Sequence, residues 1–240
     1  MDKKECQIID LGLSDYREAL LAQKSIVEDR KADKREDALI ITEHRPVFTV
    51  GRSGSLKNLL ADSSSLKASG IDILRVDRGG DITFHGPGQL VAYPIIKLRD
   101  EERDIHKFLR RLENIAISFL GEFEIEVRRR EGMTGVWVGE SKVVSIGIGL
   151  SRWVTYHGLS INICPDMRHF SMIVPCGIEG CKTVSMQEIL GQEIDMSYCK
   201  NLFAELFLKE FSYKVSCDGT NKTNHKGEIA NERSRFARAG

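Results

Sequence analysis

The segment Arg78-Gly-Gly-Asp-Ile-Thr-Phe-His85-Gly-Pro-Gly-Gln89 restricts the range of possible folds and functions more than any other part of the sequence. Four glycines and a proline fall within these twelve residues, between apolar runs at 71–76 and 90–98 that predict β-strands. Glycine permits close backbone approach and positive φ angles, so such a loop can cradle an anion or a polarised carbonyl group through its amides. The segment lacks the Gly-Lys-Ser/Thr of a P-loop, and no helix follows it as a Rossmann turn requires. The alternative from these residues alone is an irregular connection in a sheet, with His85 as a turn residue.

Cys176 lies between a proline and a glycine in the segment Val174-Pro-Cys-Gly-Ile178. The proline restricts the backbone before the cysteine, and the glycine leaves room beside the sulfur. A reactive thiol needs exposure and a positively charged neighbour that holds it as thiolate. A cysteine in a loop can equally be buried and inert, so this segment alone does not decide between a nucleophile and a structural residue.

Lys142 begins the strand-like segment Lys-Val-Val-Ser-Ile-Gly-Ile-Gly, directly after a predicted hairpin turn at 139–141. A lysine in this position is either a solvated charge or, if it is poorly solvated and faces a thiol, a group that stabilises the thiolate. Gly147 and Gly149 lie within the predicted strand, which indicates that another part of the protein packs closely there. His157, in the next strand, is compatible with a buried structural histidine and with a catalytic base.

The wider pattern predicts a single domain over 1–215. Apolar residues at helical spacing predict a first helix with Ser14 as its N-cap, and the clearest helix lies at 105–120, with Gly121 as its stop. Further helices are predicted at 184–190 and 198–211, and strands at 38–42, 47–50, 71–76, 90–98, 124–128, 134–138, 142–150 and 153–163. Because the strands are grouped between helices, we expect an α+β fold with a mixed, mostly antiparallel central sheet flanked by helices. The polar residues 216–240 predict a disordered tail.

Composition argues against several classes of protein. The chain has 240 residues, and its 35 basic and 35 acidic side chains give a formal net charge of zero, which disfavours a dedicated nucleic-acid-binding protein. No apolar run reaches the roughly 18 residues of a membrane helix. The charged N-terminus does not resemble a secretory signal, so we expect a cytoplasmic protein without a membrane segment. The six cysteines are scattered without metal-type spacing, and we expect free thiols and no metal site.

Taken in order, these segments resemble the octanoyltransferase (lipoate-protein ligase B) family. The resemblance extends over about 8–213 and rests on Arg78-Gly-Gly-x-x-Thr-Phe-His-Gly-Pro-Gly-Gln-Leu-x-x-Tyr93, Lys142-Val-x-Ser-Ile-Gly147, His157-Gly-Leu-Ser-Ile-Asn162 and Pro175-Cys-Gly-Ile178. It implies a fold shared with biotin and lipoate ligases, an α+β domain whose central mixed sheet is flanked by helices.

The resemblance also implies an acyltransferase that needs no cofactor. Family members move an octanoyl chain from acyl carrier protein to a lysine of a lipoyl domain, in 2-oxoacid dehydrogenase complexes or in the glycine cleavage H protein. Cys176 is then implied as the nucleophile that carries an acyl-thioester intermediate, and Lys142 as its activating partner. The residues implied to line the acyl pocket are Arg78, Gly79, Gly80, Asp81, Ile82, Thr83, Phe84, His85, Ser145, Ile146, Gly147, Gly158, Leu159 and Ser160.

Other functions stay open at this point. An ATP-dependent lipoate ligase of the same fold would activate the free acid and would not need Cys176, and a cysteine hydrolase would use water in place of the acceptor amine. A non-catalytic binding module is disfavoured, because a decayed site would have little reason to keep both Lys142 and Cys176. The arginine clusters at 110–111 and 128–130 are either contacts for an acidic partner or a solvated face. Cys181 is either a bystander or a thiol that resolves oxidised Cys176.

Overall fold

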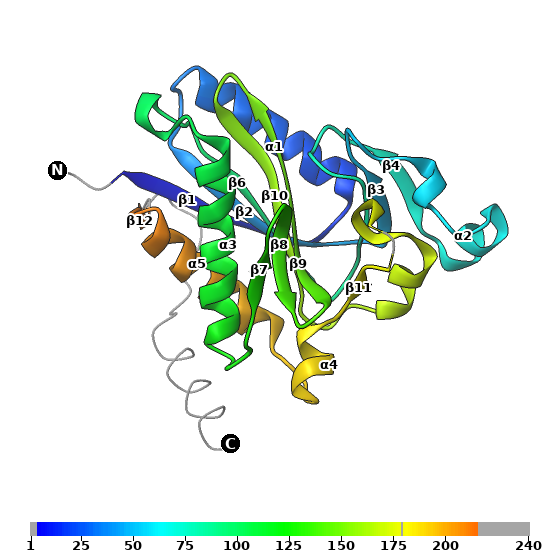
Figure 1. The fold of residues 1–240 in the computed structure, drawn as a ribbon. Coiled ribbons are helices and arrows are strands. Elements are labelled where there is room, and N and C mark those ends of the chain that lie inside the picture. The colour runs from blue at the N-terminus through cyan, green and yellow to red at the C-terminus, as the bar shows by residue number, and fades with distance from the viewer. Residues whose placement is uncertain (1–3, 179, 216–240) are drawn as a thin grey trace.

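Nine strands form one large sheet in the computed structural model, which describes residues 4–178 and 180–215 (Figure 1). The strand order is β12-β1-β2-β6-β10-β9-β8-β7, and β11 pairs with β9. Neighbours from β2 to β7 are antiparallel, whereas the pairs β12–β1, β1–β2 and β9–β11 are parallel. The bounds are β1 (Glu5–Ser14), β2 (Asp37–His44), β6 (Gln89–Ile95), β7 (Arg128–Arg130), β8 (Met133–Val138), β9 (Ser141–Ser151), β10 (Val154–Asn162), β11 (Lys182–Thr183) and β12 (Lys214–Val215). The predicted mixed, mostly antiparallel sheet is therefore confirmed.

A second sheet of three strands has the order β4-β3-β5. Its strands are β3 (Val47–Val50), β4 (Asp72–Arg75) and β5 (Ile82–His85). β5 lies inside the glycine-rich segment, where the glycines on both sides of it indicate an irregular loop rather than a strand. All four of its residues are buried, and β-branched and aromatic side chains favour a pleated, buried position.

Helices cover both faces of the large sheet (Figure 1). α1 (Tyr16–Lys31) packs on β6 and β10 on one face, and α3 (Ile105–Gly121) and α5 (Met196–Glu210) pack together on the other. The shorter helices of the described residues are α2 (Ser63–Ser69), α4 (Met186–Leu190), and the 3-10 turns η1 (Leu56–Asn58), η2 (Asp100–Glu102), η3 (Met167–Met172) and η4 (Pro175–Gly177). No helix among the described residues has both the length and the apolar character needed to cross a bilayer. The predicted helices at 105–120, 184–190 and 198–211 are confirmed to within a few residues.

The ends of some elements differ from the prediction. Ser14 is the last residue of β1, and Asp15 is the residue that caps α1, where its carboxylate accepts from two backbone N–H groups of the first turn. β1 itself gives little sequence signal, because most of its residues are half-buried and show no clear alternation. The strand expected at 124–128 begins only at Arg128, as β7. The tail predicted over 216–240 lies outside the described residues.

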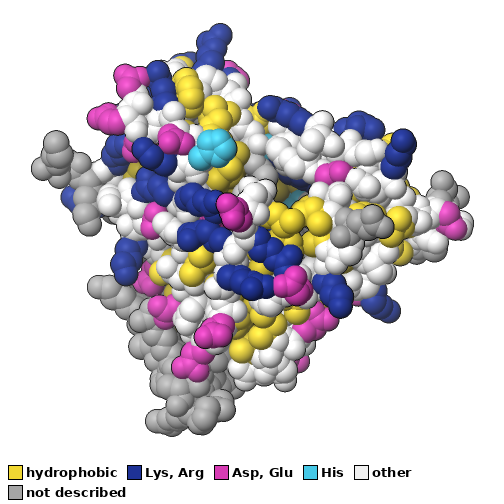
Figure 2. All heavy atoms as spheres, in the orientation of Figure 1, with side chains coloured by type: hydrophobic (Ala, Val, Ile, Leu, Met, Phe, Trp, Pro, Cys, Tyr) yellow, Lys and Arg dark blue, Asp and Glu magenta, His cyan; other side chains and the backbone are white. Residues whose placement is uncertain are grey.

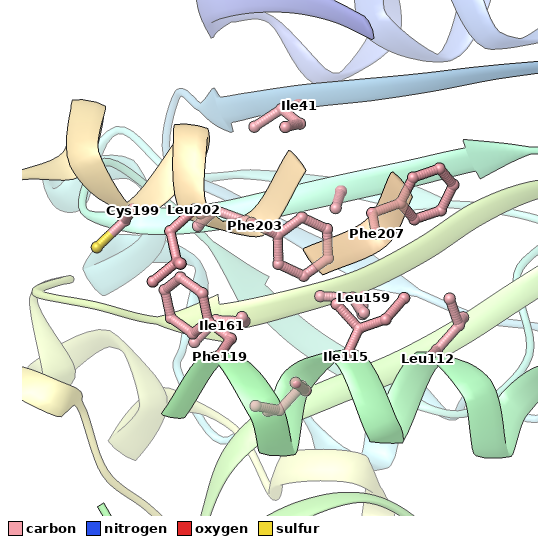
Figure 3. Close-up of a cluster of buried hydrophobic side chains, with 14 of the residues drawn as sticks. Ile41, Leu112, Ile115, Phe119, Leu159, Ile161, Cys199, Leu202, Phe203 and Phe207 are labelled. Atoms are coloured by element: carbon pink, nitrogen blue, oxygen red, sulfur yellow. The ribbon is translucent and has the colours of Figure 1, made fainter. Parts of the chain in front are cut away.

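The largest part of the core lies between the sheet and helices α3 and α5. Figure 3 shows their apolar side chains turned toward one another and toward β10. These side chains are at most 2% exposed: Leu112, Ile115, Phe119, Leu202, Phe203, Phe207, Leu159 and Ile161. Because successive residues of a strand face opposite sides, Leu159 and Ile161 fill this core while Gly158 and Ser160 face the other side of the sheet, where α1 packs.

Candidate functional site

A partly open pocket lies between the large sheet, the small sheet and the η4 turn. The lining residues are Tyr16, Arg78, Gly79, Gly80, Asp81, Ile82, Thr83, His85, Val91, Tyr93, Ser145, Ile146, Gly147, His157, Gly158, Leu159, Ser160 and Cys176. Of the residues predicted to line it, only Phe84 does not, because the alternation along β5 turns its ring to the opposite face against Phe48 and Phe170.

Glycines let the glycine-rich segment lie directly on β9. The N–H of Gly79 donates to the Ile148 carbonyl at 2.8 Å, and a Cβ on Gly147 would lie 2.6 Å from the Gly79 carbonyl oxygen. A Cβ on Gly149 would likewise lie 2.4 Å from the ring of Tyr156. A side chain at either position would collide with its neighbour. The close packing predicted from glycines inside this strand is therefore confirmed.

Cys176 occupies a tight turn with left-handed backbone. Its φ and ψ angles are 59° and 14°, and Gly177 follows with a φ of 67°. The N–H of Gly177 donates to the Val174 carbonyl at 3.0 Å, and the N–H of Ile178 donates to that of Pro175 at 3.2 Å. A non-glycine residue in this region costs on the order of 1–2 kcal/mol, so the surroundings must hold the turn in place. The turn presents the half-buried thiol to the pocket.

Asp81 and Asn58 hold the Cys176 turn in place. The Asp81 carboxylate accepts from the Asn58 side-chain amide at 2.6 Å and from the Ser55 backbone N–H at 3.1 Å. The Asn58 carbonyl accepts from the N–H of Val174 at 2.7 Å, just before the turn. Gly177 packs so closely on the carboxylate that a Cβ would lie 2.3 Å from Asp81 Oδ2. Nothing in the sequence singled out Asn58, which lies far from the other site residues along the chain.

Lys142 reaches Cys176 from the large sheet. Its side chain extends from β9 and is buried, and its ammonium Nζ donates to the Cys176 sulfur at 3.1 Å across 34 residues of chain. The same Nζ lies 5.1 Å from the centre of the Trp137 ring, within the range of a cation–π contact. Because the ammonium is largely removed from water, its attraction for a thiolate is stronger than at the surface. The structure thus brings together the two side chains predicted to act as nucleophile and activating partner.

Arg78 is a buried cation whose donors are directed at the loop and the small sheet. Its guanidinium donates to the Thr49 carbonyl at 2.7 Å, to the Thr49 hydroxyl at 2.9 Å and to the Gly79 carbonyl at 2.9 Å. No carboxylate among the described residues forms an ion pair with it, and burial lowers its pKa. The geometry therefore favours a role in holding the glycine-rich segment against β3.

Buried polar side chains form a connected chain along one wall of the pocket. His44 Nε2 lies 2.6 Å from the Tyr93 hydroxyl, and the His44 and Tyr16 rings are in contact with their centres 4.9 Å apart. Burial lowers the pKa of His157 to about 4 and raises that of Tyr16 to about 12, so both are neutral at pH 7. Neutral His157 can donate from Nε2 to Asp77 at 2.8 Å and accept at Nδ1 from Tyr16 at 3.4 Å. Since these groups satisfy one another, they leave mainly ring carbons to face a ligand.

Sequence reasoning missed four lining residues, namely Tyr16, Val91, Tyr93 and His157. The last three lie inside or beside the motifs already singled out, and their positions on β6 and β10 could have been inferred from strand alternation. Tyr16 carries no comparable signal. It is the first residue of α1, and only the packing of that helix on β10 brings it to the pocket.

Comparison with known proteins identifies the family. Residues 15–208 match the model of the lipoyl protein ligase A/B catalytic domain. An octanoyltransferase from Syntrophotalea carbinolica is 45% identical over 194 residues, which cover 81% of this chain and 89% of that protein. The chain belongs to the octanoyltransferase family.

Two solved structures place this family member in its wider fold class. Lipoate-protein ligase A, in a crystal structure with bound ATP, matches with a TM-score of 0.74 at 15% identity, over 97% of this chain and 94% of that one. The biotin protein ligase of Aquifex aeolicus, in complex with biotin and ATP, matches with a TM-score of 0.52 at 14% identity, over 87% and 71% of the two chains. At such low identity these matches concern the fold alone, and they confirm the expected biotin and lipoate ligase-like architecture.

Gly177→Ala is expected to slow alkylation of Cys176 in this octanoyltransferase family member by about tenfold or more, because small displacements of a reacting group have large effects on rate. The new Cβ would collide with Asp81 and disfavour the left-handed backbone. The rate is measured with iodoacetamide under native conditions, alongside a thermal melt. Gly180→Ala is the control, since Gly180 has a φ of 73° but open space around it. Equal slowing in both variants would contradict the contact with Asp81 as the cause.

Acidification is expected to destabilise the family member between pH 6.5 and pH 4. Burial lowers the pKa of both His44 and His157 from 6.5 to about 4 in the folded state. Protonation therefore favours the unfolded state, so the stabilisation is complete above pH 6.5 and is lost as the pH falls toward the folded-state pKa. Between pH 7.5 and pH 5 the loss is roughly 2 kcal/mol for each histidine.

Urea unfolding at the two pH values measures this loss. His157→Asn should reduce the pH dependence, because asparagine tolerates the left-handed φ of 54° at that position. His106→Asn, at an exposed position on α3, is the control. The same pH dependence in the wild type and in His157→Asn would contradict the assignment.

Proposed function

We propose that this protein transfers an octanoyl group from the thioester of acyl carrier protein to a lysine of a lipoyl domain, through an acyl-thioester on Cys176. Octanoyl transfer follows from membership in the octanoyltransferase family. The observation that carries the covalent mechanism is the 3.1 Å contact between Lys142 Nζ and Cys176 Sγ, at the edge of a pocket that Cys176 helps to line. The transfer is the first step of endogenous protein lipoylation.

In the first step the Lys142 ammonium stabilises the Cys176 thiolate, which attacks the thioester carbonyl of the donor. The carbon–sulfur bond to the carrier breaks as the bond to Cys176 forms. The carrier thiolate leaves and takes a proton from Lys142, which becomes a neutral amine. The products are an acyl-enzyme and a free carrier thiol.

In the second step the acceptor lysine attacks the acyl-enzyme as a neutral amine. Lys142, now also neutral, accepts the proton that the attacking amine loses. The carbon–sulfur bond to Cys176 breaks, an amide forms, and the starting pair of ammonium and thiolate is restored. One side chain therefore serves both half-reactions without a net change in protonation.

The pocket supports an aliphatic acyl chain. Val91 and the rings of Tyr16 and Tyr93 contribute apolar surface, and the hydroxyl and imidazole groups of the polar wall are largely bonded to one another. Burial of apolar surface stabilises by roughly 25 cal/mol per Å². A chain of eight carbons would thus be held mainly by its methylene groups.

Basic side chains near the site support docking of an acidic carrier protein. Figure 2 shows lysine and arginine side chains gathered across the middle of the face that α3 and β7 share. Arg128 and Arg130 share the single carboxylate of Glu140, so this group carries a surplus of positive charge. Complementary charge accelerates association with an acidic partner.

As acceptors we propose the lipoyl domains of 2-oxoacid dehydrogenase complexes and the glycine cleavage H protein. A cytoplasmic location stays a prediction from the sequence.

Intact-mass spectrometry with octanoyl carrier protein tests the proposal. The expected result is a stable gain of one octanoyl group on the enzyme, which passes to a lipoyl domain when that domain is added. Rapid release of free octanoate with no transfer would indicate a hydrolase. Transfer that requires ATP and free octanoate would indicate an adenylating ligase. Either of the last two results would overturn the transferase mechanism.

A further inference from the structure

Glu113 is a buried carboxylate on α3, within the helix face that packs on the sheet. It is 1% exposed. Its Oε2 accepts from Arg110 at 2.6 Å and from Arg129 at 2.8 Å, and its Oε1 accepts from the backbone N–H of Gly135 at 3.1 Å. A carboxylate is costly to bury unless such partners compensate it. The two arginines neutralise its charge, and the bond to Gly135 connects it to β8.

Gly135 forms part of the wall around the end of the Lys142 side chain. Its φ is 128°, and a Cβ there would lie 2.7 Å from Lys142 Cε and 2.6 Å from the Val144 carbonyl oxygen. The pairing of β8 with β9 shifts register immediately afterwards, between Val136 and Trp137, so β8 is irregular at this point. An irregular strand does not fix its own peptides through the regular ladder of hydrogen bonds. The bond to Glu113 supplies a fixed position for the Gly135 peptide.

We propose that Glu113 is a positioning residue for Lys142 and acts through the Gly135 peptide. Glu113 fixes Gly135, Gly135 limits the position of Lys142 Cε, and the ammonium is thereby held at 3.1 Å from the Cys176 sulfur. The inference rests on the proposed function, because it concerns the residue that activates the thiol. The hydrogen bond to the peptide, rather than the negative charge of Glu113, carries the effect.

Three variants test the inference through the pH profile of Cys176 alkylation by iodoacetamide, together with thermal melts. Glu113→Ala removes the acceptor, and it should slow alkylation at pH 7 by about tenfold, since misplacement of an activating group by a fraction of an ångström has effects of this order. Glu113→Gln keeps an oxygen that can accept from Gly135 and should stay within about threefold of wild type. Glu140→Ala is the matched control, because Glu140 also bridges two arginines near this site but is exposed and forms no bond to Gly135.

The alkylation profile separates positioning from a merely structural role. A Glu113→Ala protein that melts at a lower temperature but keeps the wild-type profile would overturn the inference. So would a Glu113→Gln variant as slow as Glu113→Ala, since the charge would then be what matters. If Glu113→Ala does not fold, Gly135→Ala takes its place, because the added Cβ would displace Lys142 directly. A wild-type profile for Gly135→Ala would also overturn the inference.

Lys142→Met distinguishes the failure of this inference from the failure of the proposed function. If Lys142→Met keeps the wild-type alkylation profile, Lys142 does not activate Cys176, and the proposed mechanism fails together with the inference. If Lys142→Met slows alkylation but Glu113→Ala does not, the mechanism stands and only the role of Glu113 is wrong.

Discussion

Cys176→Ala is expected to abolish the acyl-enzyme and to reduce octanoyl transfer by roughly a thousandfold or more, as loss of a nucleophile does in other covalent enzymes. Among the hydrogen bonds of the described residues, the Lys142 ammonium forms only the one to the Cys176 thiol, and Cys176 lines the pocket. Without it, the described lining of the pocket has no other thiol to accept the acyl group before the acceptor amine arrives. The measurements are intact mass after mixing with octanoyl carrier protein and the rate of transfer to a lipoyl domain.

Cys181→Ala is the control for this experiment. Cys181 is half-buried and lies five residues after Cys176, so it would report a general effect of losing a thiol from the same region. It should form the acyl-enzyme at close to the wild-type rate. A gain of one octanoyl group on Cys176→Ala would show that the nucleophile has been assigned wrongly.

Lys142→Met is expected to slow transfer by about 10²- to 10⁴-fold, the range typical of a lost general acid–base group. Methionine keeps much of the length and apolar stem of the buried side chain, so the cavity left behind is small. The substitution removes the charge that favours the thiolate in the first step and the amine that accepts a proton in the second. Transfer within about threefold of wild type would contradict the role of Lys142.

Lys142→Arg separates the two steps. Arginine remains protonated at any working pH, so it can favour the thiolate, while the carrier thiolate takes its proton from solvent instead. Arginine cannot accept a proton from the acceptor amine. Rapid mixing with octanoyl carrier protein should yield an acyl-enzyme that then reacts slowly with the lipoyl domain. Equal slowing of both steps would indicate that the guanidinium does not fit beside Gly135, where even an added Cβ would lie 2.7 Å from Lys142 Cε.

The elements predicted best from the sequence are those with one apolar face. The helix at 105–120 shows its pattern clearly because one side of α3 is buried against the sheet and α5. β5 was missed because glycines flank it on both sides, and β1 was missed because half-burial along most of its length leaves no clear alternation. In both cases the tertiary environment, rather than local propensity, determines the strand.

The residues of the site also differ in whether the sequence could predict them. Cys176 and Lys142 could be named because they occur in a recognisable order along the chain. Asn58 and Glu113 could not, since each acts through a single backbone group of a segment that folding brings to it. Contacts of this kind impose no particular spacing in the sequence. Phe84 shows the opposite case, because the motif is continuous along the chain, whereas the Phe84 ring packs against Phe48 and away from the pocket.

The contact between Cys176 and Lys142 joins two separately supported parts of the molecule. The cysteine's turn is anchored through Asn58 and Asp81 to the segments that flank the small sheet, whereas the lysine extends from β9 of the large sheet. A relative slip of the two sheets by about 1 Å would take the sulfur and the nitrogen out of hydrogen-bonding range. Reactivity of the thiol therefore depends on how firmly the two sheets are joined, and substitutions along their seam can alter turnover while both sheets stay folded.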